Sequence, residues 1–159
     1  MSGNKLNRRG LLKSGAVLGA GLAMPTIFTS SARAFTNEPT GSNVILGFNV
    51  PQTGAYADEG ADELRAYELA VEHLNGGGDG GMLQTFSSKA LDGTGILGKK
   101  VDYVTGDTQT TSDAARASAQ SMIQKDGAIM ITGGSSSGVA IAVQGLCQEA
   151  GVIFMAGLT

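Results

Sequence analysis

The sequence predicts an α/β fold, in which helices cover both faces of a parallel β-sheet. Short apolar runs of strand length alternate along residues 44–159 with longer segments whose apolar residues recur at helical spacing. Glycine, proline and polar residues stand at the junctions between these segments. Single strands that alternate with single helices are typical of parallel sheets with right-handed crossovers. Ligands of such sheets bind at the carboxyl ends of the strands, so a site is expected there.

The first strand is expected at Val44–Val50, a mostly apolar run with little alternation, as in strands covered on both faces. Pro51 ends this strand. A helix should follow, because carboxylates suit the positive end of a helix dipole and apolar residues then recur on one face. The carboxylates are Asp58, Glu59, Asp62 and Glu63, and the face comprises Gly60, Leu64, Tyr67, Val71 and Leu74.

The segment 76–98 is rich in glycine and is interpreted as a surface excursion. Within it, Gly93 to Gly98 match the dinucleotide pattern G-x-G-x-x-G. That fingerprint must follow a strand and open a helix, whereas this one precedes a strand predicted at 100–105. A nucleotide site is therefore not expected.

The second predicted strand leads into a polar loop that contains Asp107, and an alanine-rich helix then runs to about Lys125. Thr111 or Ser112 is placed to cap this helix, and Asp113 suits its first turn. Its inward face should contain Ala115, Ala119, Met122 and Ile123.

A serine-rich turn joins the third strand, predicted at 129–131, to the third helix. Residues 133–138 read Gly-Gly-Ser-Ser-Ser-Gly, and helical spacing begins at Val139. Such a turn leaves backbone N–H groups unpaired at the positive end of a helix, where a carboxylate or phosphate is favoured. Gly151 ends the helix before a fourth predicted strand, 152–155.

Two other interpretations of this turn remain open. Residues 134–138 match G-x-S-x-G, the nucleophile elbow of α/β-hydrolases, with Ser136 as the nucleophile. In those enzymes an acid and a histidine follow the serine, yet here Glu149 is the only acid after Ser136 and no histidine follows. Alternatively, the serines simply cap a helix.

The first 34 residues are interpreted as an export signal. Paired arginines precede two leucines and a lysine over residues 7–13, and a mildly apolar, Gly/Ala-rich segment follows. Ala32 and Ala34 supply the small residues that a signal peptidase reads. We expect a twin-arginine signal peptide over 1–34, a mature tail over 35–43, and a periplasmic product. The segment is short and glycine-rich for a membrane span, which disfavours an uncleaved anchor.

Charge and cysteine content narrow the classes of partner. Five of the eleven basic residues and none of the fourteen acidic ones lie in the first 34 residues, so the remainder is strongly acidic. Its basic residues are scattered, which excludes nucleic acid as a partner. Cys147 is the single cysteine and falls on the third helix, where a buried free thiol is expected.

The order of these features resembles the first lobe of periplasmic binding proteins of the leucine/isoleucine/valine type, the type I fold. The resemblance rests on a strand, a Thr-Gly turn, an acidic helix ending near Asn75, a strand closing on Asp107, and an apolar strand followed by Gly-Gly-Ser-Ser-Ser-Gly-Val-Ala. It implies a two-lobed receptor, not an enzyme and without a cofactor, that captures a small solute and delivers it to the permease of an ABC importer. Residues 44–159 would then be a partial N-terminal lobe of a longer protein.

The resemblance also implies site residues. Ser137 corresponds to the serine whose hydroxyl and N–H hold the ligand carboxylate at the start of the third helix, and Ser136 is expected to share that role. Ser135 lies farther from the helix start, so we expect its hydroxyl to contribute little to affinity. Further ligand contacts of the family come from the loop after the fourth strand, which makes Thr159 a candidate.

In the first loop, a ligand-stacking tyrosine of branched-chain amino-acid binders aligns with Glu59, and Tyr56 is the nearby candidate. This departure disfavours an aliphatic amino acid and leaves a different amino acid, an amide and a small carboxylate equally open as ligands. A ligand-sensing receptor module of the same fold remains an alternative function, as does the hydrolase with Ser136.

Overall fold

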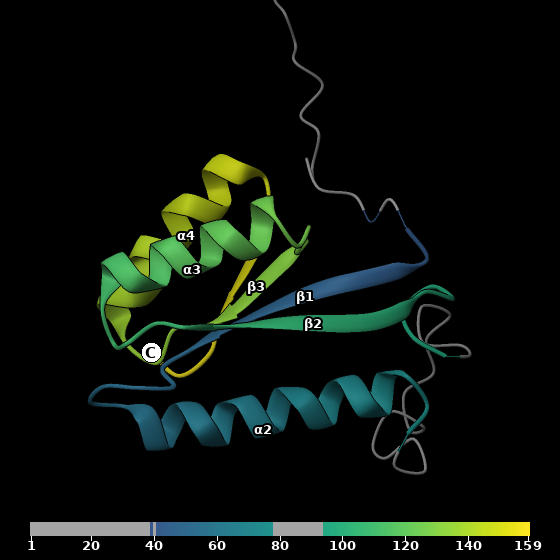
Figure 1. Ribbon diagram of the computed structural model, residues 1–159, viewed down its shortest axis with the longest axis horizontal. Helices are drawn as coiled ribbons and strands as arrows, with labels where there is room; N and C mark the ends of the chain where they lie inside the picture. The colour runs from purple at the N-terminus through teal and green to yellow at the C-terminus, as the bar shows by residue number, and fades with distance from the viewer. Residues whose placement is uncertain (1–38, 40, 78–93) are drawn as a thin grey trace, which may run out of the picture. The chain divides into compact units, whose positions relative to one another are not determined.

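The computed structural model describes residues 39, 41–77 and 94–159, and these form alternating strands and helices. All strand pairs are parallel, in the order β2-β1-β3-β4 (Figure 1). The predicted α/β class is therefore confirmed, with boundaries within about two residues of those expected. The elements are β1 (Asn43–Val50), α2 (Ala57–Leu74), β2 (Lys100–Asp107), α3 (Ser112–Gln124), β3 (Met130–Gly133), α4 (Ser137–Ala150) and β4 (Ile153–Ala156).

The strand order changes direction at β1. The chain moves from β1 to β2 on one side, then returns past β1 to build β3 and β4 on the other. This reversal places α2 on one face of the sheet and α3 with α4 on the opposite face (Figure 1). In open α/β sheets, such a reversal opens a crevice outside the carboxyl ends of the central strands, here β1 and β3.

The α2 face packs around the aromatic side chain of Phe48. Its ring centroid lies 5.0 Å from that of Tyr67 on α2 and 5.0 Å from that of Tyr103 on β2. Val71 is buried on the same side, as the spacing predicted. The buried apolar residues of this face are Val44, Leu46, Phe48, Val71 and Val101.

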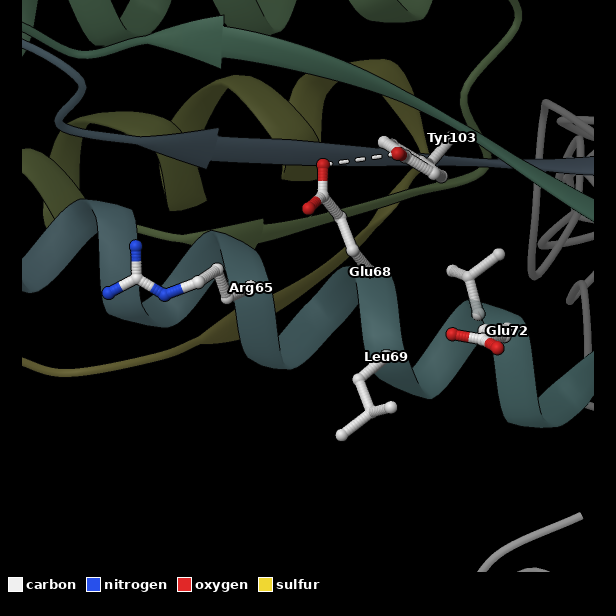
Figure 2. Close-up of a pocket in the computed structure, with 6 residues that line it drawn as sticks. Arg65, Glu68, Leu69, Glu72 and Tyr103 are labelled. Carbon is white, nitrogen blue, oxygen red and sulfur yellow. Dashed lines mark hydrogen bonds between the residues drawn. The ribbon is translucent and has the colours of Figure 1, made fainter. Parts of the chain in front are cut away.

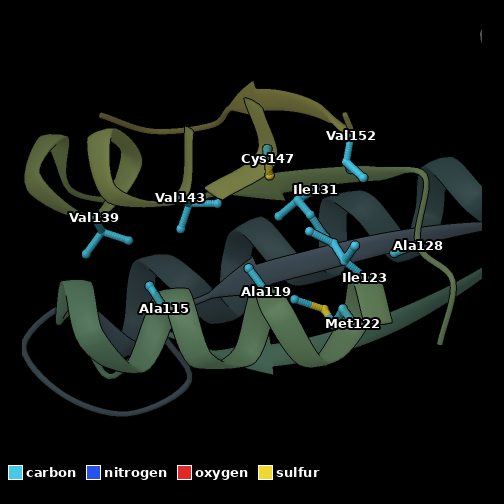
Figure 3. Close-up of a cluster of buried hydrophobic side chains, with 10 residues drawn as sticks. All are labelled: Ala115, Ala119, Met122, Ile123, Ala128, Ile131, Val139, Val143, Cys147 and Val152. Atoms are coloured by element: carbon cyan, nitrogen blue, oxygen red, sulfur yellow. The ribbon is translucent and has the colours of Figure 1, made fainter. Parts of the chain in front are cut away.

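The opposite core lies between the sheet and the α3/α4 pair (Figure 3). Helix α3 contributes the four residues that its spacing predicted to face inward. Thr111, one of the two predicted caps, is its N-cap and accepts a hydrogen bond from the N–H of Ala114. The core residues are Ala115, Ala119, Met122, Ile123, Ala128, Ile131, Val139, Val143, Cys147 and Val152.

Cys147 is buried within this core on α4. Its neighbours in the cluster are apolar, and burial raises the pKa of the thiol to about 11. The expected buried free thiol is thus confirmed.

Strand β4 is exposed on the face that α2 covers elsewhere. Ile153 pairs with Met130, whose side chain packs on the α2 side, so Ile153 and Met155 point to that same side. Their exposed fractions are 41% and 54%. Phe154 points the other way and packs against the α3/α4 core.

Several sequence expectations fall outside the described residues. These are the signal peptide over 1–34, residues 35–38 and 40 of the tail over 35–43, and most of the glycine-rich segment 76–98. One boundary of the tail is corrected, because Asn43 already pairs with Lys100 as the first residue of β1. Across the residues that the structure describes, no helix is both long and apolar enough to span a membrane.

Candidate functional site

Four loops leave the carboxyl ends of the strands and fall into two halves. The β1/β2 half comprises residues 51–56 and 108–111, and the β3/β4 half comprises residues 134–136 and 157–159. Because the sheet is parallel, all four loops share one edge, as predicted. The two halves differ in how their hydrogen-bond donors are used.

In the β1/β2 half, Asp107 ties the two loops together. Its Oδ1 accepts hydrogen bonds from the backbone N–H groups of Gln52 at 2.9 Å, Thr53 at 3.2 Å and Gln109 at 2.8 Å. Its Oδ2 accepts from the Thr53 hydroxyl at 2.7 Å. Burial pushes the pKa of Asp107 upward, but these four hydrogen bonds outweigh it and hold the pKa below its ordinary value.

Tyr56 belongs to this same half. It is the N-cap residue of α2, its side chain is exposed, and its backbone N–H donates to the Thr110 hydroxyl at 3.4 Å. Gln109 and Thr110 both have positive φ, and Gly54 packs so tightly here that a Cβ would lie 2.9 Å from the Gln109 carbonyl oxygen. The loop after β1 is therefore seated directly on the loop after β2.

The β3/β4 half begins with three consecutive residues of positive φ: Gly133, Gly134 and Ser135. A Cβ on Gly133 would collide with the carbonyl oxygen of Asn49 on β1, so only glycine fits at the end of this strand. Ser135 has φ 48, a left-handed conformation that non-glycine residues seldom adopt. This turn aims the chain into the first turn of α4.

Helix α4 starts without a side-chain cap. Ser136 is the N-cap residue with extended backbone, and its side chain makes no capping hydrogen bond. The first backbone bond of the helix runs from the N–H of Ala140 to the Ser136 carbonyl. Within the described part of the chain, the N–H groups of Ser137, Gly138 and Val139 have no acceptor, and neither serine hydroxyl is paired. Ser137 is exposed at the first helical position, with donors available to a bound anion.

Thr159 lies next to this helix start. A Cβ placed on Gly134 would be 3.7 Å from Cγ2 of Thr159 and 3.5 Å from Cβ of Ala140. The structure therefore brings Ser136, Ser137 and Thr159 to one half of the edge. It places the fourth candidate, Tyr56, in the other half.

Glu63 has a role at this edge that the sequence analysis did not predict. Expected among the carboxylates at the start of α2, it is instead buried, with an exposed fraction of 8%. Its Oε2 accepts a hydrogen bond from the Ser135 hydroxyl at 2.6 Å, and its Oε1 accepts one from the Tyr67 hydroxyl. Glu63 follows Gly60 by three residues and precedes Tyr67 by four, so helical spacing already put it on the inward face.

Tyr67 extends this hydrogen-bonded chain to β3, because its hydroxyl oxygen accepts from the Thr132 hydroxyl at 3.2 Å. Burial raises the pKa of Tyr67 to about 12, and the hydrogen bond to Glu63 adds to the shift. Tyr67 therefore remains a proton donor to Glu63 at neutral pH.

The geometry does not support Ser136 as the nucleophile of a hydrolase. The single histidine of the chain, His73, lies in the last turn of α2. That end of α2 is tied to the start of β2 by two hydrogen bonds between the Asn75 side chain and the Val101 backbone, at 2.7 and 2.9 Å. His73 is thus at the opposite edge of the sheet from Ser136.

A shallow groove of about 660 Å³ lies along α2 beside the edge strand β2, away from the strand ends (Figure 2). Tyr103 donates a hydrogen bond to Glu68 across it, at 3.1 Å. Its lining mixes charged and apolar side chains: Arg65, Glu68, Leu69, Val71, Glu72 and Tyr103. None of these belongs to the carboxyl-edge loops. Among the described residues no cluster of histidine, cysteine and acidic side chains is arranged to hold a metal ion.

The chain belongs to the periplasmic binding protein family, whose model matches residues 43–159. The matched range starts at the first residue of β1 and includes both halves of the carboxyl edge. No curated protein matches the chain.

Solved structures of similar fold include three solute-, substrate- or leucine-binding proteins. One is the solute-binding protein of an ABC transporter from Rhodopseudomonas palustris in complex with 3,4-dihydroxybenzoic acid (22% identity, TM-score 0.55, covering 73% of this chain and 27% of that one). A second is the branched-chain amino-acid transporter substrate-binding protein LivJ from Streptococcus pneumoniae in complex with isoleucine (23% identity, TM-score 0.58, covering 72% of this chain and 28% of that one). A third is the leucine-binding protein LivK from Thermotoga maritima (20% identity, TM-score 0.57, covering 71% of this chain and 27% of that one). The chain spans about a quarter of the length of these structures.

Proposed function

We propose that this chain is part of the extracytoplasmic substrate-binding component of an ABC importer, and that it binds the carboxylate of a small organic ligand at the start of α4. The observation that carries the proposal is the uncapped N-terminus of α4 at the carboxyl edge, where Ser136 and Ser137 keep their donors free of partners among the described residues. Membership of the periplasmic binding protein family supports it.

The chemistry of the start of α4 favours a carboxylate. The partial positive charge of a helix N-terminus attracts an anion, and the N–H groups of its first turn point toward it. The hydroxyl and the backbone N–H of Ser137 belong to one residue, so they can address the two oxygens of one carboxylate. Isoleucine and 3,4-dihydroxybenzoate, bound by two proteins of similar fold, differ in almost everything except that both carry this group.

The remainder of the ligand would face the other candidates. Thr159 lies beside Gly134 and offers a hydroxyl, while the exposed ring of Tyr56 stands in the β1/β2 half. An amino acid, an amide or another small carboxylate fits this set of groups. We propose periplasmic delivery through the twin-arginine pathway and transfer of the ligand to a membrane permease, with no nucleic-acid partner and no cofactor.

A calorimetric titration of the full-length protein tests the proposal directly. The probes are isoleucine, leucine and 3,4-dihydroxybenzoate, each paired with an analogue that lacks only the carboxylate: 2-methylbutylamine, 3-methylbutylamine and catechol. We expect binding of at least one acid and no detectable binding of its analogue. Equal binding of an acid and its analogue would contradict a carboxylate site, and turnover of an ester would instead revive the hydrolase.

A further inference from the structure

Glu63 is a buried carboxylate that the proposed ligand contacts do not use. Both of its oxygens accept hydrogen bonds from neutral hydroxyl groups, those of Ser135 and Tyr67. No lysine or arginine pairs with it among the described residues. A buried carboxylate held only by hydroxyls is costly to retain for stability alone, so its placement calls for a reason.

Ser135 supplies that reason, because it occupies the left-handed region at φ 48 and immediately precedes the N-cap of α4. The sequence pattern led us to expect little contribution to affinity from the Ser135 hydroxyl as a direct ligand contact; its hydrogen bond to Glu63 gives it an indirect one. A serine in this region is strained, and such residues persist only where their surroundings hold them. The 2.6 Å hydrogen bond from the Ser135 hydroxyl to Glu63 is the side-chain contact that the structure shows at this residue. Glu63 therefore restrains the residue that sets the direction in which α4 begins.

Two further residues, Tyr67 and Gly157, hold the Glu63 carboxylate in place. Tyr67 links Glu63 to Thr132 on β3, so the hydrogen-bonded chain returns to the strand three residues before Ser135. Gly157 closes over the carboxylate from the loop after β4, where a Cβ would collide with Glu63 Oε1 and lie 2.7 Å from the Tyr67 hydroxyl. Gly157 also donates its N–H to the Gly133 carbonyl at 2.9 Å.

We propose that Glu63 is a positioning residue for the ligand site: it holds Ser135 in its left-handed conformation, so that the donors of Ser136 and Ser137 face the carboxyl edge. Gly157 is its close neighbour, since a Cβ at this position would displace the Glu63 carboxylate from its present place. This inference rests on the proposed function, because it assigns Glu63 to the same site.

The experiment compares Glu63→Gln, Glu63→Met and Ser135→Gly with the double variant Glu63→Met/Ser135→Gly, all in the full-length protein. Glutamine keeps the shape and can bond both hydroxyls, whereas methionine fills the space without accepting a hydrogen bond. Glycine at position 135 adopts positive φ without strain, so it should make Glu63 dispensable. Isoleucine and 3,4-dihydroxybenzoate are the probes.

We expect Glu63→Met to weaken binding about tenfold, the order of effect that loss of a left-handed restraint carries. Glu63→Gln should stay within about threefold of wild type, and the double variant should recover most of the loss. A double variant as weak as Glu63→Met would overturn the proposal, since glycine at 135 needs no restraint to adopt positive φ. Tighter binding by Glu63→Gln would also overturn it, because it would show that Glu63 acts through its charge.

A second readout needs no ligand and separates failure of this inference from failure of the proposed function. Amide chemical shifts of residues 135–139 in the empty protein should move in Glu63→Met and return in the double variant. Gly157→Ala should reproduce the shifts of Glu63→Met. If the wild type binds neither probe, the proposed ligand class fails, while unchanged amide shifts in Glu63→Met would overturn the positioning role alone.

Discussion

The β1/β2 half of the carboxyl edge and the β3/β4 half use similar residues, yet they treat hydrogen-bond donors in opposite ways. In the first, Asp107 collects three backbone N–H groups and a hydroxyl, and Thr111 caps α3. In the second, the side chain of Ser136 leaves α4 uncapped. Donors that are satisfied internally hold a loop in place, whereas donors left open are available to a ligand. The contrast distinguishes loops that internal hydrogen bonds hold in place from a helix start whose donors are open to a ligand.

The largest effect on stability should come from Asp107→Ala in the β1/β2 half. Four hydrogen bonds to one carboxylate would be lost, and three backbone N–H groups would need new acceptors. We expect the free energy of unfolding to fall by roughly 2–4 kcal/mol, measured by urea denaturation. A loss below about 0.5 kcal/mol, the usual range for surface substitutions, would show that water replaces Asp107 without cost.

The pH dependence of the same group gives an independent check. The pKa of Asp107 is lowered in the folded state, so its contribution to stability is present above the unfolded pKa of about 3.9. It is lost as the pH falls through the lower folded pKa. The difference in unfolding free energy between wild type and Asp107→Asn should therefore shrink as the pH falls from about 5 to below the unfolded pKa. A difference that stays constant over that range would contradict this assignment.

Ser137→Ala in the β3/β4 half should produce the next largest effect, a loss of ligand affinity. Removing a donor to a buried ligand carboxylate costs about 1.5–3 kcal/mol, which weakens binding by about one to two powers of ten. Titration of isoleucine and 3,4-dihydroxybenzoate measures it. The melting temperature of the empty protein should change little, and a Ser137→Ala variant with wild-type affinity would remove Ser137 from the site.

Thr111→Ala is the matched substitution on α3. Its hydroxyl accepts from the N–H of Ala114, so its loss should cost about 1 kcal/mol of stability. Ligand affinity should remain that of the wild type, which makes this variant the control for Ser137→Ala. Weakened binding by Thr111→Ala would show that the two halves are not independent.

The smallest effect on stability is expected for Ser136→Ala. The side chain of Ser136 makes no capping bond, so the free energy of unfolding should change by less than about 0.5 kcal/mol. A loss near 1 kcal/mol in thermal or urea unfolding would mean that Ser136 caps α4 in solution, and the contrast between the two halves would then fail.

The sequence allowed the fold to be predicted where each element's own pattern decides its placement. The inward face of α3 follows from helical spacing, and its N-cap follows from a threonine before the first turn. The buried character of β1 follows from its continuous apolar run, since the strand lies between β2 and β3 with helices on both faces. These are local signals that tertiary contacts reinforce.

The candidate site could be predicted only in part, because its geometry depends on contacts between distant residues. Helical spacing allowed Glu63 to face inward, but an acidic residue in an acidic segment is usually solvated. Its partner Ser135 lies 72 residues farther along the chain. The role of Asp107 as an anchor was missed for the same reason, since its main partners follow β1 rather than β2.

Gly157 also makes a contact between distant residues that the sequence pattern does not show. The sequence pattern gives no reason for a glycine at position 157, directly after β4. The structure shows what a side chain there would meet, because a Cβ at 157 would collide with the Glu63 carboxylate. The buried acid on α2 and the glycine after β4 are thus packed closely together.

The burial of Cys147 gives the molecule a native reporter of its own opening. As the only thiol in the chain, packed in the α3/α4 core with a pKa of about 11, it is almost entirely protonated and shielded at neutral pH. A thiol-specific reagent can reach it only when α4 detaches from the sheet or the domain unfolds. The rate of labelling therefore measures how often that face opens. The same measurement with and without ligand would show how strongly an anion at one end of α4 secures the helix along its length.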